Sequence, residues 1–216
     1  MKGPHQGQPV RTAGTPLSRA RGAMVMLHGR GATAESMLSL ASELNAPHFA
    51  YLAPQARGNS WWPQSFLAPI ASNEPGISSA MAAVEDVLRQ TAAAGIPPER
   101  TFLLGFSQGA CLATEFAARH ARRYGGVAAL SGGLIGPDGT PRDYAGSLDG
   151  TPVFLGCSDG DSHIPAERVQ LSTEVMRRLG GDVTMRLYPG MGHTINEDEI
   201  AAVQAMMEAI ALNPSV

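Results

Sequence analysis

Six short apolar runs alternate along the chain with stretches of helical periodicity. The runs lie at residues 23–27, 49–53, 101–105, 126–130, 152–155 and 183–188, and glycine, proline or polar residues bound them. Continuous apolar runs of this length are typical of strands that are buried on both faces of a parallel sheet. The segments between them are amphipathic. Strands that alternate with helices predict an α/β fold, with a mostly parallel central sheet and helices on both faces.

The length and composition suit a single domain. The chain has 216 residues, of which 44% are hydrophobic and 16% charged, and we find no repeat or linker that divides it. Residues 1–20, rich in Gly, Pro, Gln and Arg, are expected to form a short or loosely ordered N-terminal segment. We therefore predict one domain over residues 1–216.

The same data restrict the partners and the compartment. The net charge is −3 and the basic residues are scattered, which argues against a nucleic-acid partner. The N-terminus has no apolar signal-peptide core, and no stretch reaches the roughly 20 apolar residues of a membrane helix. With two cysteines and no targeting signal, we expect a cytoplasmic protein without stable membrane insertion. A homodimer is left open.

A nucleophile motif follows the third apolar run. Residues 105–109 are Gly-Phe-Ser-Gln-Gly, and an Ala-rich helical segment comes next. This is the strand-to-helix context of the nucleophile elbow of α/β-hydrolases, in which a sharp turn raises the serine hydroxyl above the sheet. We predict that Ser107 is the nucleophile. The backbone N–H of Gln108, at the helix N-terminus, is a candidate oxyanion donor.

A serine nucleophile needs a base, and the base needs an acid that orients it. In α/β-hydrolases the acid and then the histidine follow the serine in the chain. His193, in Gly-Met-Gly-His after the last apolar run, is the candidate base. Two aspartates, Asp159 and Asp161, follow the run at 152–155. Position alone leaves both open as the acid.

A glycine-containing loop follows the first apolar run. It has the sequence His28-Gly-Arg-Gly, and in α/β-hydrolases the second oxyanion N–H comes from this loop. We predict that the backbone N–H of Arg30 is this donor and that His28 braces the loop. The guanidinium of Arg30 is expected to be solvated, with contact to an anionic substrate as the alternative.

Two segments could shape a pocket. Segment 133–150 is polar, turn-rich and too short for a large cap domain. Segment 57–76 carries several large apolar side chains, among which Trp62 and Phe66 are the best candidates to line an acyl pocket. The alternative is that they only attach this segment to the sheet. A short or medium acyl chain is predicted.

The motifs HGRG, GFSQG, DGDSHIP and GMGH, in this order, resemble those of the phospholipase/carboxylesterase family, which includes acyl-protein thioesterases and small bacterial carboxylesterases. The resemblance extends over residues 23–210. It implies that the second aspartate of the third motif, Asp161, is the acid. Three departures, at Ala32, at Cys157-Ser158 and at Ser162, favour the bacterial carboxylesterase branch.

The resemblance implies a serine carboxylesterase that hydrolyses short- to medium-chain esters through an acyl-enzyme. A small-molecule ester would be its partner, with no metal or organic cofactor. One alternative is an acyl-protein thioesterase or lysophospholipase that uses the same residues. A remote alternative is a non-catalytic ligand binder, although such proteins usually lose one of the three catalytic groups.

Overall fold

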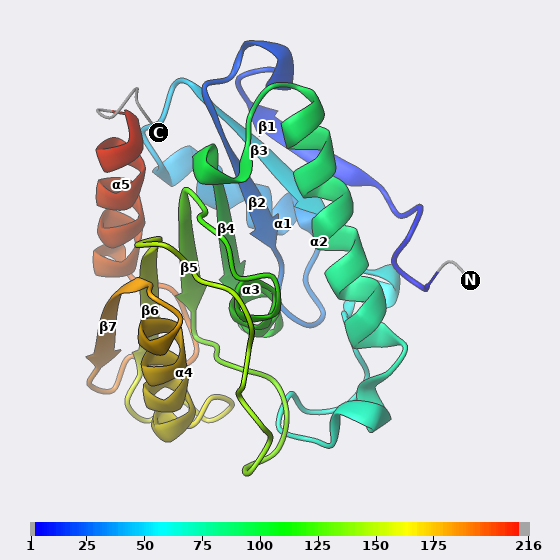
Figure 1. Cartoon of the computed structure of the whole chain (residues 1–216), viewed down its shortest axis with the longest axis vertical. Helices are drawn as coiled ribbons and strands as arrows, with labels where there is room; N and C mark the ends of the chain where they lie inside the picture. Colours follow the sequence, from blue (N-terminus) through cyan, green and yellow to red (C-terminus); the bar gives the residue numbers. More distant parts are fainter. Residues whose placement is uncertain (1–2, 212–216) are drawn as a thin grey trace.

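The computed structural model describes residues 3–211 and contains one seven-stranded sheet (Figure 1). The strands lie side by side in the order β1-β3-β2-β4-β5-β6-β7. Within the described residues β1 pairs antiparallel with β3, and each other neighbouring pair is parallel. The strands are β1 (Val10–Gly14), β2 (Gly22–Leu27), β3 (Phe49–Pro54), β4 (Thr101–Phe106), β5 (Gly126–Leu130), β6 (Pro152–Ser158) and β7 (Asp182–Tyr188).

Helices cover both faces of the sheet, as the alternation predicted. They are α1 (Ala34–Ser39), α2 (Gly76–Ala93), α3 (Gln108–Arg119), α4 (Ala166–Arg178) and α5 (Glu197–Ala211). The side chains of β2 alternate between two cores, because successive residues of a strand point to opposite faces. Val25 packs in the core beneath α2, α3 and α4, and Met26 packs in the core beneath α1 and α5. Residues 3–211 thus form an α/β-hydrolase arrangement without a large cap.

All six predicted strands are present, but their environments differ. Strands β2 to β5 are buried along almost their whole length, and so is β6. The expectation of burial on both faces is wrong for β7, where exposed and half-buried residues alternate. Its position at the edge of the sheet explains this, because within residues 3–211 it pairs with one strand only, β6.

The N-terminal segment is more ordered than the composition suggested. Residues 1 and 2 lie outside the described range, but Val10–Gly14 form β1 at the other edge of the sheet. His5 is 5% exposed, and its Nε2 lies 2.8 Å from the carbonyl oxygen of Trp61. The expectation of loose order therefore fails over this part of the segment, because strand pairing and a buried imidazole attach it to the domain.

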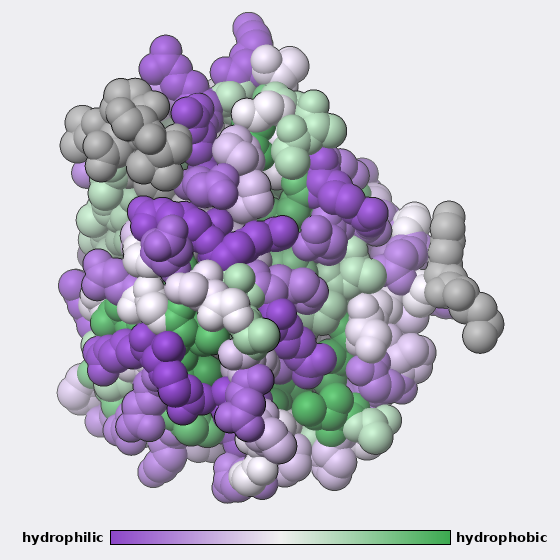
Figure 2. Space-filling view, viewed as in Figure 1, coloured by the Kyte–Doolittle hydropathy of each residue, from purple (hydrophilic) through white to green (hydrophobic). Residues whose placement is uncertain are grey.

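The face that carries α2, α3 and α4 is mostly hydrophilic, with small hydrophobic areas between polar side chains (Figure 2). Across residues 3–211 no helix combines the length and the apolar character required to cross a membrane.

Segment 133–150 contains no helix and buries Leu134, Ile135 and Leu148 against the core. Segment 133–150 therefore does not form a cap domain.

Candidate active site

Ser107 lies on a strained turn between β4 and α3. Its backbone has φ 55° and ψ −118°, which is rare for a residue with a side chain. The flanking glycines are required by contact: a Cβ on Gly105 would lie 2.1 Å from the carbonyl oxygen of Gly109. A Cβ on Gly109 would lie 2.0 Å from the carbonyl oxygen of Leu27. The elbow motif therefore works by removing two side chains where strand and helix pack closest.

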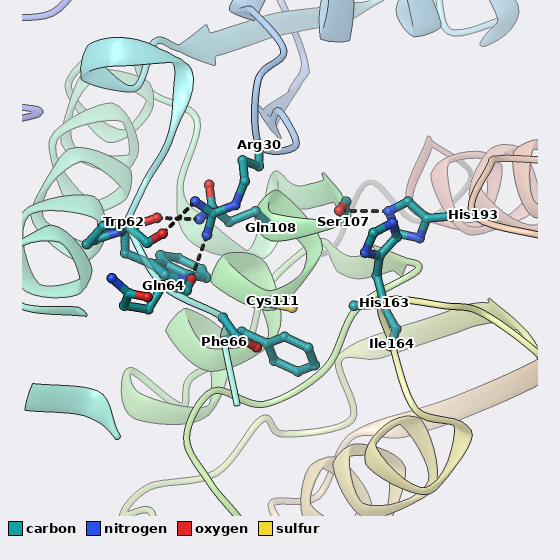
Figure 3. A pocket seen from close by; sticks show the side chains of 12 residues that line it. Arg30, Trp62, Gln64, Phe66, Ser107, Gln108, Cys111, His163, Ile164 and His193 are labelled. Carbon is teal, nitrogen blue, oxygen red and sulfur yellow. Dashed lines mark hydrogen bonds between the residues drawn. The ribbon is translucent and has the colours of Figure 1, made fainter. Parts of the chain in front are cut away.

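Three of the predicted residues form one hydrogen-bonded line. Nε2 of His193 lies 2.8 Å from Oγ of Ser107 (Figure 3). Nδ1 of His193 lies 2.7 Å from Oδ2 of Asp161. Both distances are within the range for direct proton transfer and orientation. The imidazole that accepts the Ser107 hydroxyl at Nε2 must carry its proton at Nδ1, which faces the carboxylate. The line therefore selects one tautomer of His193.

Asp161 is held in place and kept ionised. Burial alone would raise its pKa, but three hydrogen bonds outweigh burial and leave the pKa of Asp161 below its ordinary value. Its Oδ2 receives the His193 ring, and its Oδ1 accepts backbone N–H groups from His163 at 2.8 Å and Ile164 at 3.1 Å. The Cys157 thiol also approaches Oδ2, at 3.7 Å.

Asp159 has a different environment. Its Oδ1 accepts the backbone N–H of Gly190 at 3.0 Å, in the loop that leads to His193. Its own N–H donates to the carbonyl of Tyr188. Asp159 thus connects the ends of β6 and β7, and of the two aspartates only Asp161 contacts the His193 ring.

The two predicted oxyanion donors lie beside Ser107. Gln108 is the first residue of α3, so its N–H has no acceptor within the helix. The loop after β2 passes close to the serine, since a Cβ on Gly29 would be 3.3 Å from Cβ of Ser107. Arg30 follows in this loop and lines the same pocket as Ser107 and Gln108.

His28 braces the loop, as expected. Its Nδ1 lies 2.8 Å from the carbonyl oxygen of Gly29, and its Nε2 accepts the Ala56 N–H at 3.1 Å. The indole N–H of Trp61 donates to the His28 carbonyl at 2.9 Å. Burial is the main cause that lowers the pKa of His28. A neutral His28 therefore joins the loop after β2 to the segment after β3.

Two side-chain roles were not predicted from the sequence. The Gln108 side chain accepts the N–H of Trp61 at 2.8 Å through Oε1 and donates to the carbonyl of Trp62 at 2.9 Å through Nε2. The Arg30 guanidinium is exposed, but it donates to carbonyls of segment 57–76, which corrects the expectation that it is simply solvated. Neither role has a local sequence signal, because the partners lie more than thirty residues away.

A cavity of about 560 Å³ opens beside Ser107 (Figure 3). Trp62 and Phe66, the two candidates from segment 57–76, line it and are 2% and 7% exposed. Trp61, by contrast, is fully buried against His28 and belongs to the alternative in which aromatic side chains attach the segment. The remaining lining residues are Arg30, Pro63, Gln64, Ser65, Ser107, Gln108, Cys111, His163, Ile164 and His193. Burial raises the pKa of the Cys111 thiol to about 12, so it stays protonated.

Aromatic rings flank His193. The ring of His163 meets it edge to face with centroids 4.7 Å apart, and the ring of Phe106 lies 5.1 Å away. Phe106 also lines a second cavity of about 490 Å³, together with apolar side chains such as Met37, Leu40 and Ile195. The His193 ring is thus fixed by packing as well as by hydrogen bonds.

Comparison with known proteins agrees with this geometry. The family model described as Phospholipase/Carboxylesterase matches residues 13–211. A phospholipase/carboxylesterase from Dyadobacter fermentans DSM 18053, solved by crystallography, is 44% identical; the match covers 94% of this chain and 97% of that one with a TM-score of 0.91. The crystal structure of esterase PE8 is 26% identical over 93% and 97%, with a TM-score of 0.77.

The match to a curated relative covers a smaller part of both chains. Acyl-protein thioesterase 1 of Gibberella zeae is 33% identical over 135 residues, which are 61% of this chain and 57% of that protein. The match thus spans little more than half of that relative. The family model, in contrast, covers nearly the whole sheet together with the Ser107, Asp161 and His193 positions. The chain belongs to the phospholipase/carboxylesterase family.

Proposed function

We propose that the protein is a serine carboxylesterase that hydrolyses short- to medium-chain carboxylic esters through an acyl-enzyme. The observation that carries the proposal is the unbroken line from Ser107 through His193 to Asp161, with distances of 2.8 and 2.7 Å, at the mouth of the cavity. Membership of a family of carboxylic ester hydrolases supports it. A non-catalytic binder would have no need for all three groups to be hydrogen-bonded in this line.

In the acylation step, Oγ of Ser107 attacks the ester carbonyl carbon while Nε2 of His193 takes the hydroxyl proton. The carbonyl oxygen becomes an oxyanion, and the backbone N–H groups of Arg30 and Gln108 stabilise it, each by about 3 kcal/mol. The bond to the alcohol oxygen then breaks, and His193 returns the proton to that oxygen. Asp161 stabilises the imidazolium throughout, which its low pKa permits.

Deacylation repeats the same steps with water. Nε2 of His193 takes a proton from water, whose oxygen attacks the acyl carbon, and the proton passes to Oγ of Ser107 as the bond to the serine breaks. Every proton transfer uses one nitrogen, so the tautomer fixed by Asp161 serves both halves. No other protein group has to titrate during the cycle.

The same groups would cleave a thioester, as the name of the Gibberella relative suggests for that protein. The cavity favours the ester proposal with a short or medium acyl part, because polar side chains such as Gln64 and Ser65 share its wall with Trp62 and Phe66.

We also propose a cytoplasmic location, supported by Cys111 and Cys157, both of which are buried free thiols.

The test is hydrolysis of p-nitrophenyl acetate, butyrate, octanoate and palmitate by the wild type and by Ser107→Ala. We expect turnover of the shorter esters and a loss of at least about a thousandfold in the variant. Turnover that is equal in the variant would refute the proposal. A wild type that is inert on all four esters, but active on an acyl thioester, would replace it with the thioesterase alternative.

A further inference from the structure

The cavity beside Ser107 has an unusual charge balance. Of the residues that line it, Arg30 is the one with a permanent charge, and none is an aspartate or glutamate. The chain as a whole carries −3, and the Asp161 carboxylate contacts the His193 ring and is not part of the cavity wall. An exposed guanidinium at the wall of a substrate cavity attracts anionic groups of the molecule that binds there.

The hydrogen bonds of Arg30 leave its charge unpaired. Its Nη1 donates to Oγ of Ser60 at 3.2 Å and to the carbonyl of Pro63 at 2.9 Å, and its Nη2 donates to the carbonyl of Gln64 at 2.6 Å. All three acceptors are neutral, and none of the ion pairs found within residues 3–211 includes Arg30.

These three bonds also fix the guanidinium in place. An arginine has five N–H donors, so the Nε–H and one Nη2–H remain for another acceptor. A guanidinium held in one orientation loses little entropy when it binds a carboxylate. The loop contacts therefore prepare Arg30 for an anionic ligand.

The proposed mechanism tells which part of the substrate meets Arg30. His193 returns its proton to the leaving oxygen, so the alcohol part must lie on the His193 side of Ser107. Figure 3 shows Arg30 and Gln64 on the opposite side of Ser107 from His193. The acyl part of the ester extends toward that side, where the guanidinium lies.

We propose that the preferred substrates are esters whose acyl part ends in a carboxylate, that is, half-esters of dicarboxylic acids, with Arg30 as the specificity-determining residue. The inference rests on the proposed esterase function. The reaction breaks the bond between the acyl carbon and the alcohol oxygen and forms one to the oxygen of water. The products are the alcohol, a dicarboxylate and, at neutral pH, one proton.

The test compares kcat/KM for monoethyl adipate with that for ethyl adipamate, in which a carboxamide of the same shape replaces the carboxylate. We expect a preference of about tenfold or more for the carboxylate, as for a hydrogen-bonded charge. The preference should shrink as NaCl rises from about 0.05 to about 0.5 M, because salt screens an exposed guanidinium. Acetoxybutanoate, with its carboxylate in the alcohol part, should show no such preference over its amide.

Two variants separate the charge from the loop contacts. Arg30→Met should bring the ratio of the two kcat/KM values to about one. Ser60→Ala removes one contact of the same guanidinium but keeps its charge, and should retain most of the ratio. Both variants are compared by this ratio and not by total activity, since Arg30 also belongs to the proposed oxyanion loop.

The proposal is overturned if the wild type hydrolyses the amide as well as the acid, or if Arg30→Met keeps the preference. It is also overturned if the carboxylate is preferred in the alcohol part. These outcomes are distinct from failure of the esterase function, in which neither ester would be hydrolysed in a Ser107-dependent way. If Arg30→Met does not fold, the wild-type ratio and its salt dependence still decide.

Discussion

At the scale of single residues, the serine and the histidine could be predicted because each sits in a local motif at the end of a strand. The acid could not be chosen by position, since Asp159 and Asp161 both follow β6. The difference between them is which one reaches His193, and that depends on the loop after β7. The side-chain contacts of Arg30 and Gln108 with segment 57–76 were equally hidden, because packing and not sequence proximity creates them.

This difference gives a prediction for the two aspartates. Asp161→Asn should lower kcat by about ten-thousandfold, because an amide N–H facing His193 favours the wrong tautomer. Asp159→Asn is the matched control: its amide oxygen can still accept the Gly190 N–H, so activity should stay within a few-fold of the wild type. Ester hydrolysis by each variant, with circular dichroism to check folding, decides. A large loss in Asp159→Asn alone would exchange the two roles.

At the scale of elements, strands β2 to β7 could be predicted, and the edge strand β1 could not. Strands β2 to β6 are buried, so they stand out as apolar runs. Strand β1 is half exposed, and its sequence Val-Arg-Thr-Ala-Gly has no such run. This strand forms because it pairs with β3. Its own sequence does not indicate a partner about forty residues away in the chain.

The packing of β4 against α3 gives a prediction about stability. Gly109→Ala should destabilise the fold by at least about 3 kcal/mol, because its Cβ would lie 2.0 Å from the backbone oxygen of Leu27, in a place where neither element can move away. In a domain of this size that corresponds to a fall in Tm of about 10 °C.

Gly160→Ala is the control for that substitution. A Cβ on Gly160 would have no atom within 4 Å, so the change should stay within about 0.5 kcal/mol. Thermal unfolding followed by circular dichroism compares the two variants. Equal Tm values would show that Gly109 is not needed for the packing of β4 against α3.

At the scale of the whole molecule, two buried histidines connect parts of the chain that are distant in sequence. His5 joins the N-terminal segment to segment 57–76: its Nδ1 accepts the Arg57 N–H at 3.1 Å, so its Nε2–H must donate to the carbonyl of Trp61. His28 makes the corresponding connection to Ala56. In both rings one nitrogen accepts a backbone N–H, so a second proton would place donor against donor.

This arrangement predicts how stability depends on pH. Burial is the main cause that lowers the pKa of His5 and of His28 below 6.5. Unfolded chains then bind more protons than folded ones just below pH 6.5, so this stabilisation is present above that pH and is lost as the pH falls. Glu199 acts in the opposite sense, because burial raises its pKa to about 7 and its contribution is lost as the pH rises from about 4.5 toward that value.

The difference in unfolding free energy between wild type and a His5 variant does not contain the Glu199 contribution, because both proteins have Glu199. His5→Asn keeps an acceptor for the Arg57 N–H but leaves the Trp61 carbonyl unpaired, so at pH 8 it should be less stable by about 1–2 kcal/mol. Because the variant has no imidazole to protonate, the gap should narrow steadily toward pH 5.5 as the wild type loses its His5 contribution. Urea unfolding at several pH values measures this difference in unfolding free energy. The control is His48→Asn, at an exposed histidine, which should be as stable as the wild type. A gap that stays constant or widens in acid would mean that His5 is not held neutral, and that its bonds to segment 57–76 do not depend on a single tautomer.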